Sequence, residues 1–312
     1  MRIRTMTDAD HEAVLACLAD VSDHASVNTT TPERFGQLLA SGSYRPEWTW
    51  LALDGDRIAG LAVWWGVPGG TNPMALDCLY ADPSVADPVA LWADLIGRTR
   101  EAVGDGLEYH IFLPPAWRER PDVVAAVEPR LAAASRAGLT GLVERLRYEW
   151  VPAAGVPEGS GRLTFAAADD EAFVDVFRRV AEGSLDAHTR AEIARAGAEA
   201  YARADLEAYR SMPGPRDWWR LAYDPDGELV GFAIPSANAA GPVVGFLGVL
   251  PEQRGHGYVD DLLAEITSFL AGTGAERIVA DTDTTNLPMA AAFDRAGYRV
   301  FGIRLVASDA SH

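Results

Sequence analysis

The chain repeats one local pattern about 170 residues apart, and this repetition restricts the possible folds more than any other feature. Near Trp48 an apolar strand pattern reaches a turn at Asp54-Gly55-Asp56 and continues to Trp64, which predicts a β-hairpin. Trp218 opens the same pattern, with Asp224 in the place of Asp54. Self-similarity at a fixed period is the sequence signature of a duplicated structural unit. The sequence therefore predicts two copies of one fold.

A segment rich in proline, glycine and small residues, 151–161, separates the two copies. Such a composition favours a linker, because it neither buries an apolar face nor supports a regular helix or strand. We therefore expect one domain over residues 1–150 and a second over residues 162–312. A chain of 312 residues is long for one domain and comfortable for two that each bury a core.

The formal net charge of -18 argues against a nucleic-acid partner, because binding a phosphate backbone requires a basic face. No apolar run approaches the roughly 20 residues of a membrane-spanning helix, and the first residues lack the apolar segment of a signal peptide. We therefore expect a cytoplasmic protein with no membrane partner. The two cysteines, Cys17 and Cys78, lack the spacing of a metal or redox motif, so no metal site is predicted.

The second copy contains a strand, a glycine-bearing loop and a helix in succession. The apolar run 243–250 predicts a buried strand that ends at Pro251, and residues 260–270 have apolar side chains at helical spacing. The loop between them contains Gly255 and Gly257, which can adopt a positive φ. Such a loop directs several backbone N–H groups and a helix N-terminus at one point, where a phosphate is stabilised. The alternative interpretation is an ordinary turn before a helix.

The segment that follows has a second strand at 278–283, a polar turn with Asn286, and a helix that stops at Gly297-Tyr298. Together these elements resemble the acetyl-coenzyme A binding core of the GCN5-related N-acetyltransferase (GNAT) family. The loop pattern of that family is met from Arg254 to Tyr258, and the pairing of Asn286 with Gly297-Tyr298 matches its second signature. Val259 stands where the family has glycine or alanine, so we expect some crowding but not loss of the site.

The resemblance implies an α/β (α+β) architecture of two tandem GNAT-like domains, each a mixed, mostly antiparallel twisted sheet flanked by helices. It also implies acetyl-CoA as co-substrate. Pantetheine would pair with one strand as an added strand, and the loop would bind the diphosphate. The coenzyme-binding residues that the resemblance implies are Leu247, Gly248, Val249, Arg254, Gly255, His256, Gly257, Tyr258, Val259 and Asn286.

The first copy departs from this pattern in the corresponding loop. When Pro83 is aligned with Pro251, Ala86 replaces the loop arginine and Val89 replaces the second glycine. Pro88, which has no N–H to offer, replaces the histidine between the two glycines. We therefore expect the first domain to be a degenerate copy that does not bind coenzyme A.

Acyl transfer from a thioester to an amine requires a group that takes a proton from the amine. Asp281 is the candidate base, because the resemblance places a carboxylate five residues before Asn286, and Asp283 shares its face of the strand. One of the two is expected to be the base and the other a substrate contact. Alternatively, both only end a strand in a polar turn. Phe293 occupies the position of the tyrosine that serves as acid in many relatives, so the general acid is not identified.

The segment between the first two helices of the second copy lies over the acceptor site in the resembled family. Here it contains Glu182, Asp186 and His188, which could hold an ammonium group by charge-assisted hydrogen bonds. The alternative is a solvated helix start with Asp186 as its N-cap.

These observations predict an acetyltransferase that moves an acetyl group from acetyl-CoA to the amine of a small molecule by direct attack on the thioester. A non-catalytic acyl-CoA sensor or partner-binding protein is the alternative from another functional class. A mycothiol synthase-type acetyltransferase is a second enzyme alternative, which shares the layout of a degenerate first copy and an active second copy. The identity of the acceptor, the length of the acyl group and the oligomeric state do not follow from the sequence.

Overall fold

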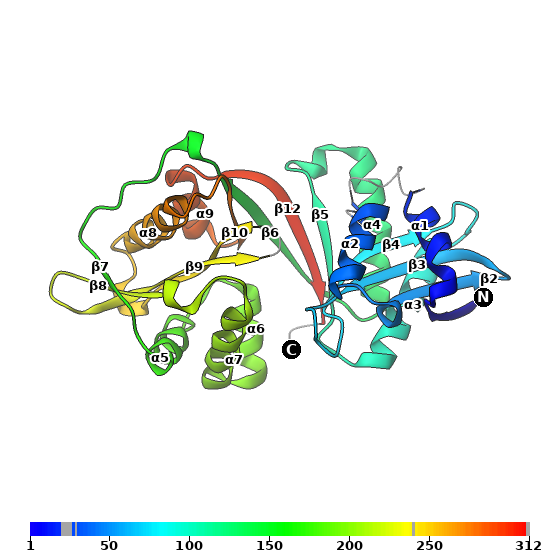
Figure 1. Cartoon of the computed structure of the whole chain (residues 1–312), viewed down its shortest axis with the longest axis horizontal. Helices are drawn as coiled ribbons and strands as arrows, with labels where there is room; N and C mark the ends of the chain where they lie inside the picture. The colour runs from blue at the N-terminus through cyan, green and yellow to red at the C-terminus, as the bar shows by residue number, and fades with distance from the viewer. Residues whose placement is uncertain (20–26, 29, 239–240, 310–312) are drawn as a thin grey trace. The chain divides into compact units, whose positions relative to one another are not determined.

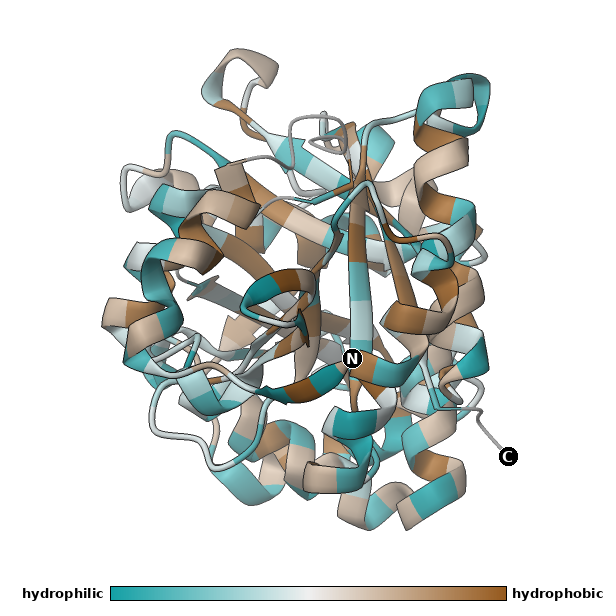
Figure 2. Cartoon of the chain, turned by 90° about the vertical axis from the view of Figure 1, so that its right-hand side faces the viewer, coloured by the Kyte–Doolittle hydropathy of each residue, from teal (hydrophilic) through white to brown (hydrophobic). Residues whose placement is uncertain are grey.

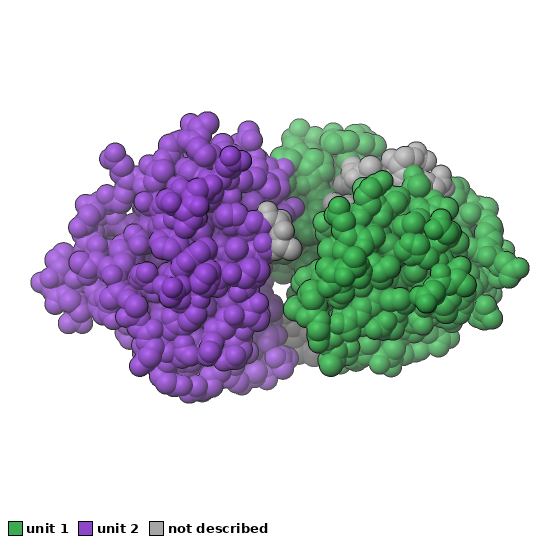
Figure 3. All heavy atoms as spheres, in the orientation of Figure 1, with its two compact units in different colours: residues 1–144, 302–311 green, residues 145–301, 312 purple. Residues whose placement is uncertain are grey.

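The computed structural model describes residues 1–19, 27–28, 30–238 and 241–309, which form two compact units (Figures 1 and 3). Unit 1 contains residues 1–144 and the strand that follows from Gly302, and unit 2 contains residues 145–301. No helix in the described ranges is long and apolar enough to cross a membrane.

The first repeat alternates strands and helices. Its elements are β1 (Arg2–Thr5), α1 (His11–Ala19), α2 (Pro32–Ser41), β2 (Thr49–Asp54), β3 (Arg57–Trp65), β4 (Ala75–Ala81), α3 (Pro88–Val103), β5 (Glu108–Leu113) and α4 (Pro121–Arg136), followed by β6 (Gly141–Trp150). Short 3₁₀ turns occur at Asp8–Asp10, Pro46–Trp48 and Trp117–Glu119. The hairpin predicted from the turn at Gly55 is confirmed as β2 and β3.

The second repeat has the same order of elements, with two helices where the first repeat has α2. Its elements are β7 (Thr164–Ala166), α5 (Asp170–Val180), α6 (Ala187–Ala196), α7 (Ala198–Ser211), β8 (Arg220–Tyr223), β9 (Leu229–Asn238), β10 (Gly241–Val249), α8 (Tyr258–Gly272), β11 (Ile278–Asp283), α9 (Leu287–Arg295) and β12 (Arg299–Ser308). Short 3₁₀ turns occur at Pro152–Ala154, Arg216–Trp218 and Pro251–Gln253. The expectation of a duplicated fold is confirmed.

The sheets of the two units have matching strand orders. In unit 1 the order is β1-β2-β3-β4-β5-β12, and in unit 2 it is β7-β8-β9-β10-β11-β6. Only β4 with β5 and β10 with β11 run parallel, and the other neighbours are antiparallel. Each sheet is therefore mixed and mostly antiparallel, as the resemblance implies.

The final strand of each repeat pairs in the unit of the other repeat. Residues 145–150 of β6, which belong to the first copy in sequence, pair with the whole of β11 in unit 2. Residues 303–307 of β12, from the second copy, pair with β5 in unit 1. Compact units and sequence repeats therefore divide the chain at different points.

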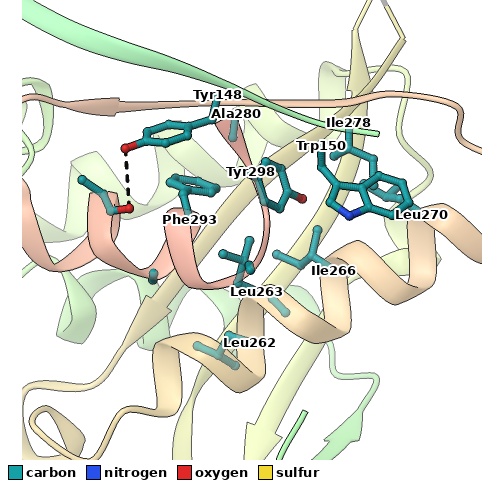
Figure 4. Close-up of a cluster of buried hydrophobic side chains, with 14 of the residues drawn as sticks. Tyr148, Trp150, Leu262, Leu263, Ile266, Leu270, Ile278, Ala280, Phe293 and Tyr298 are labelled. Carbon is teal, nitrogen blue, oxygen red and sulfur yellow. Dashed lines mark hydrogen bonds between the residues drawn. The ribbon is translucent and has the colours of Figure 1, made fainter. Parts of the chain in front are cut away.

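Both faces of the unit 2 sheet carry an apolar core. Helices α8 and α9 cover one face, and α5 and α7 cover the other (Figure 1). Under α8 and α9, the ring of Phe293 stacks on Tyr148 with centroids 4.7 Å apart and meets Tyr298 edge-on (Figure 4). On the opposite face, Phe177 packs 4.8 Å from Phe232. Fully burying side chains of this size contributes about 1.5–3 kcal/mol each, so the sheet is held from both sides.

Unit 1 has its own core between α1, α2 and the strands, which includes Phe35, Tyr44, Leu51 and Leu61. Figure 2 shows hydrophilic and hydrophobic residues alternating along the helices, as expected where one helix face packs and the other is solvated. Thr31 caps α2 by accepting a hydrogen bond from the Arg34 N–H, which explains why this helix starts at its proline.

Candidate functional site

The loop between β10 and α8 has the geometry of an anion-binding turn. Gly255 and Gly257 have φ values of 86° and 73°, in the left-handed region that glycine adopts at low cost. Within the described part of the chain, no acceptor meets the backbone N–H groups of the five residues 255–259. These donors lie at the N-terminus of α8, where the helix dipole also favours negative charge.

Two arginines hold this loop in place. Arg254 donates from Nη2 to the Val180 carbonyl at the end of α5 (2.8 Å) and from Nε to the Val249 carbonyl at the end of β10 (3.3 Å). Arg162 donates to the His256 carbonyl (2.8 Å) from the other side. Arg254 therefore shapes the turn through main-chain contacts, and Arg162 has a similar role that the sequence analysis missed.

Arg162 is itself fixed by α8 and by the segment that precedes it. Its Nε lies 2.8 Å from Oδ2 of Asp261, and its guanidinium lies over the ring of Tyr258. Oδ1 of Asp261 accepts the Ser160 N–H at 2.7 Å. The only sequence signal for this arrangement is an aspartate in the first turn of an apolar helix.

Strands β10 and β11 diverge beside the loop. They pair only at Val243 with Val279, whereas β10 continues its pairing with β9 to Val249. Residues 247–249 therefore have a strand partner on one side only, among the residues described. The Leu250 N–H donates to the Val230 carbonyl on β9, so by strand alternation the Val249 N–H points to the open edge.

Gly248 allows α5 to approach this strand closely. A Cβ at Gly248 would lie 2.4 Å from Val180 Cγ1 and 3.0 Å from Phe232 Cε1. Asn286, at the start of α9, accepts the Met289 N–H as an N-cap, and its side-chain NH₂ has no acceptor among the described residues. Gly248 thus permits close packing at this site, and Asn286 caps a helix.

Asp281 and Asp283 lie on the face of β11 opposite to Ala280, which is part of the α8–α9 core. Each is opposite an arginine of β6: Arg147 Nε lies 3.6 Å from Asp281 Oδ1, and Arg145 Nε lies 3.3 Å from Asp283 Oδ1. Asp281 is half-buried, whereas only 1% of Asp283 is exposed.

The environment of Asp283 acts on its ionisation in opposing ways. Burial raises the pKa of the Asp283 carboxyl above its ordinary value, while the Ala187 N–H and Arg145 oppose that rise. The Ala187 N–H donates to Oδ2 at 2.7 Å, which fastens the start of α6 to the end of β11.

Three residues were predicted to bind the amine substrate, and the structure brings one of them, Asp186, to the carboxylates of β11. Asp186 is the N-cap of α6, accepting the Thr189 N–H at 2.9 Å, and it also accepts from Arg145 Nη2 at 3.0 Å. Its neighbours Glu182 and His188 are exposed. Asp186 therefore acts as a helix cap and also lies close to the carboxylates of β11.

Helix α7 adds a polar group that the sequence analysis missed. Tyr201, Asp205 and Tyr209 follow one another at helical spacing, and the ring of Tyr209 stacks on Phe246 of β10 at 5.2 Å. Burial raises the pKa of Asp205 to about 6, against a hydrogen bond from Tyr201. In the sequence, the spacing of four residues shows only that these side chains share one face of a helix. It does not show whether that face is buried.

The residue at the position expected for the general acid, Phe293, has an apolar side chain. Phe293 is buried between Tyr148 and Tyr298 (Figure 4). The Tyr148 hydroxyl donates to the Ala290 carbonyl at 3.5 Å, and the Tyr298 hydroxyl shares a hydrogen bond with Thr267. Burial raises the pKa of both tyrosines, so neither is prepared to exchange a proton.

Residues 185–298 match the model of the Acetyltransferase (GNAT) family. The second repeat therefore carries a GNAT domain. The matched segment contains β10, the loop 254–259, β11 and Asn286, which together form the site described above. No curated protein matches the sequence significantly.

Solved GNAT structures cover both repeats. A GCN5-related N-acetyltransferase from Sphaerobacter thermophilus is 16% identical, with a TM-score of 0.60 over 98% of this chain and 94% of that chain. A tandem GNAT protein from the clavulanic acid biosynthesis pathway is 16% identical, with a TM-score of 0.51 over the whole of both chains. A glucosamine N-acetyltransferase region of a fungal multi-domain GH3 β-N-acetylglucosaminidase is 14% identical, with a TM-score of 0.59 over 98% of this chain and 38% of that chain. The protein therefore has a tandem GNAT fold.

Proposed function

We propose that unit 2 transfers an acetyl group from acetyl-CoA to the amine of a small molecule by direct attack on the thioester. The observation that carries the proposal is the run of five backbone N–H groups at 255–259 that have no acceptor among the described residues, beside the open edge of β10. A diphosphate bound in this turn directs the pantetheine chain along residues 247–249, where an extended ligand can pair as an added strand.

The open edge of β10 also has the donor that the reaction requires. Charge develops on the thioester oxygen during attack, and a fixed backbone N–H stabilises it. The Leu250 N–H is excluded, because it already donates to the Val230 carbonyl. The Val249 N–H points to the open edge and is the donor we assign. The NH₂ group of Asn286 can bind an amide oxygen of pantetheine.

Asp281 is the base in this proposal. An alkyl amine is mostly protonated at pH 7, so it must lose a proton before it attacks. Asp281 is half-buried on the face of β11 that carries the polar residues, whereas Asp283 is 1% exposed and engaged by Arg145 and the Ala187 N–H. Asp283 therefore positions its neighbours and does not contact the substrate. Asp186 lies at the rim, where it can bind a cationic amine.

The leaving thiolate departs without a tyrosine acid. Phe293 has no proton to give, and the two tyrosines beside it are buried and hydrogen-bonded. A thiol pKa of about 8.5 makes coenzyme A thiolate a fair leaving group near neutral pH. Loss of a general acid therefore slows the reaction without preventing it.

The test is thiol release from acetyl-CoA in the presence of a panel of small amines, followed with a thiol-reactive dye. Replacing Asp281→Asn should lower kcat by roughly 10²–10⁴-fold, the usual contribution of a general base, and leave the Kd for acetyl-CoA unchanged by calorimetry. An unchanged rate would remove Asp281 as the base.

A non-catalytic acyl-CoA sensor is the second candidate, and the buried Phe293 at the acid position favours it. Tight binding of acetyl-CoA without thiol release from any amine in the panel would support the sensor. Failure to bind acetyl-CoA would refute both candidates.

A further inference from the structure

Strand β6 is the last strand of the first repeat, yet its second half belongs to unit 2. Residues 145–150 pair antiparallel with all six residues of β11. The register places Arg145 opposite Asp283, Arg147 opposite Asp281 and Glu149 opposite Val279. The two carboxylates therefore face arginines that come from the other repeat.

The core fixes this register. Tyr148 and Trp150 are buried in the α8–α9 core (Figure 4). Leu146 packs against the same core. Side chains alternate along a strand, so Arg145 and Arg147 must lie on the opposite face, with Asp281 and Asp283. A slip of one residue would turn both arginines into the core, which excludes it.

Arg145 links two elements of the site. Its Nη2 donates to Asp186 at the start of α6, and its Nε lies 3.3 Å from Asp283 at the end of β11. Burial and the carboxylate of Asp186 raise the pKa of Asp283. The Ala187 N–H and the positive charges of Arg145 and Arg190 act in the opposite direction. Without Arg145, Asp283 would take up a proton more readily and would be a poorer acceptor for the Ala187 N–H that holds α6.

Arg147 restricts the neighbouring carboxylate. Its Nε lies 3.6 Å from Asp281, and its guanidinium lies 4.7 Å from the ring centroid of Phe301. The aromatic contact limits the directions that the guanidinium can take, so the carboxylate beside it has a preferred orientation.

We propose that the first repeat completes the acyl-transfer site of unit 2 with two positioning residues, Arg145 and Arg147, carried there by the exchanged strand β6. Arg145 opposes the protonation of Asp283 and holds α6 in place, and Arg147 orients Asp281. This inference rests on the proposed transferase function for its kinetic consequences. Residues 162–312, the second repeat alone, hold neither arginine.

The test compares Arg145→Gln and Arg147→Gln with Glu149→Gln in the full-length chain. Glu149 is the matched control, because it lies on the same face of β6 and pairs with Arg277 (2.7 Å) and Arg299 (2.8 Å). Both arginine variants should lower kcat by roughly tenfold to a hundredfold, as displaced catalytic groups do, with the Kd for acetyl-CoA unchanged. The control should retain the wild-type kcat.

Conservative variants separate positioning from strand stability. Lysine keeps the charge, so Arg145→Lys should recover more activity than Arg145→Gln, and Arg147→Lys more than Arg147→Gln. Arg145→Gln should also move the acidic limb of the kcat/KM profile to higher pH, because Asp283 then binds its proton more tightly. Arginine variants that behave like Glu149→Gln in kcat and pH profile would overturn the inference while the transferase function stands.

A second measurement does not depend on activity. Carboxyl ¹³C NMR of the full-length protein, with the Asp283 signal assigned from Asp283→Asn, reports the titration of this group directly. Its midpoint should rise in Arg145→Gln and stay unchanged in Glu149→Gln. An unchanged midpoint in Arg145→Gln refutes the role of Arg145. A raised midpoint in a protein that transfers no acyl group refutes the proposed function and keeps the control of Asp283 by Arg145.

Discussion

Replacement of Gly248 by alanine tests how closely α5 must approach β10 for the coenzyme loop to form. The added Cβ would lie 2.4 Å from Val180 Cγ1 and 3.0 Å from Phe232 Cε1, so Val180 has to move. Overpacking of this kind costs typically 1–3 kcal/mol, and we expect about 2 kcal/mol for Gly248→Ala. For a unit of this size that corresponds to a fall of roughly 4–8 °C in Tm.

The displacement should also reach the loop. The Val180 carbonyl accepts the 2.8 Å hydrogen bond from Arg254, so movement of the end of α5 loosens the turn. We therefore expect weaker binding of acetyl-CoA by Gly248→Ala in isothermal calorimetry, together with the lower Tm measured by circular dichroism. Gly272→Ala is the control, because nothing lies within 4 Å of a Cβ at this position on α8. Its Tm should be unchanged or slightly higher.

A double mutant identifies the contact. Val180→Ala removes the methyl group that the new Cβ would meet, so Gly248→Ala should cost less in that background. We expect a coupling free energy of about 1 kcal/mol or more between the two substitutions. Strict additivity, or a Tm for Gly248→Ala equal to that of the wild type, would refute the packing argument.

Two further predictions concern charge. Arg254→Glu should raise the Kd for acetyl-CoA at least about tenfold, since it removes two hydrogen bonds to the main chain and places a negative charge beside the diphosphate; Ala86→Glu in the first copy should leave the calorimetric Kd unchanged. Asp205→Asn should stabilise the protein at pH 7 by up to about 2–3 kcal/mol, because the folded-state pKa of Asp205 is about 6 against an ordinary 3.8. Well below pH 3.8 the carboxyl is protonated in both states and the variant has no advantage; in urea titrations the advantage should grow from about pH 3.8 to pH 6 and then level off.

The elements around the coenzyme loop could be predicted because their signals are local. Pro251 ends a β-branched run, and the structure has β10 end at Val249 with a 3₁₀ turn at the proline. Gly255 and Gly257 precede an apolar helical repeat, and both adopt positive φ. Glycine in a turn and the spacing of apolar residues in a helix are signals that extend over a few residues. Both can therefore be recognised without knowledge of the rest of the fold.

The exchange of strands could not be predicted in this way. Leu146, Tyr148 and Trp150 alternate with polar residues, a pattern that suits the edge of either sheet equally well. The choice of partner depends on contacts more than a hundred residues away, such as Tyr148 with Phe293. The sequence does not mark Arg145 and Arg147 for the same reason, because a charged side chain acquires its role only from the strand opposite it.

In the first repeat, the end of β4 corresponds to the open edge of β10. Leu79 stands four residues before Pro83, as Leu247 stands four residues before the corresponding proline, and β4 pairs with β5 only at Ala75 and Leu76.

The Leu79 carbonyl, at this diverging edge, accepts hydrogen bonds from Asn28 (3.2 Å) and from Arg130 (3.4 Å). Arg130 is 1% exposed and lies over the ring of Trp92, so a pantetheine chain would have to displace a buried, hydrogen-bonded cation to pair there. These contacts at the end of β4 do not involve β6, whose residues from Arg145 onward belong to unit 2. A single repeat can therefore close its own strand edge and also donate two arginines to unit 2, and the second contribution is the one on which the proposed acyl transfer depends.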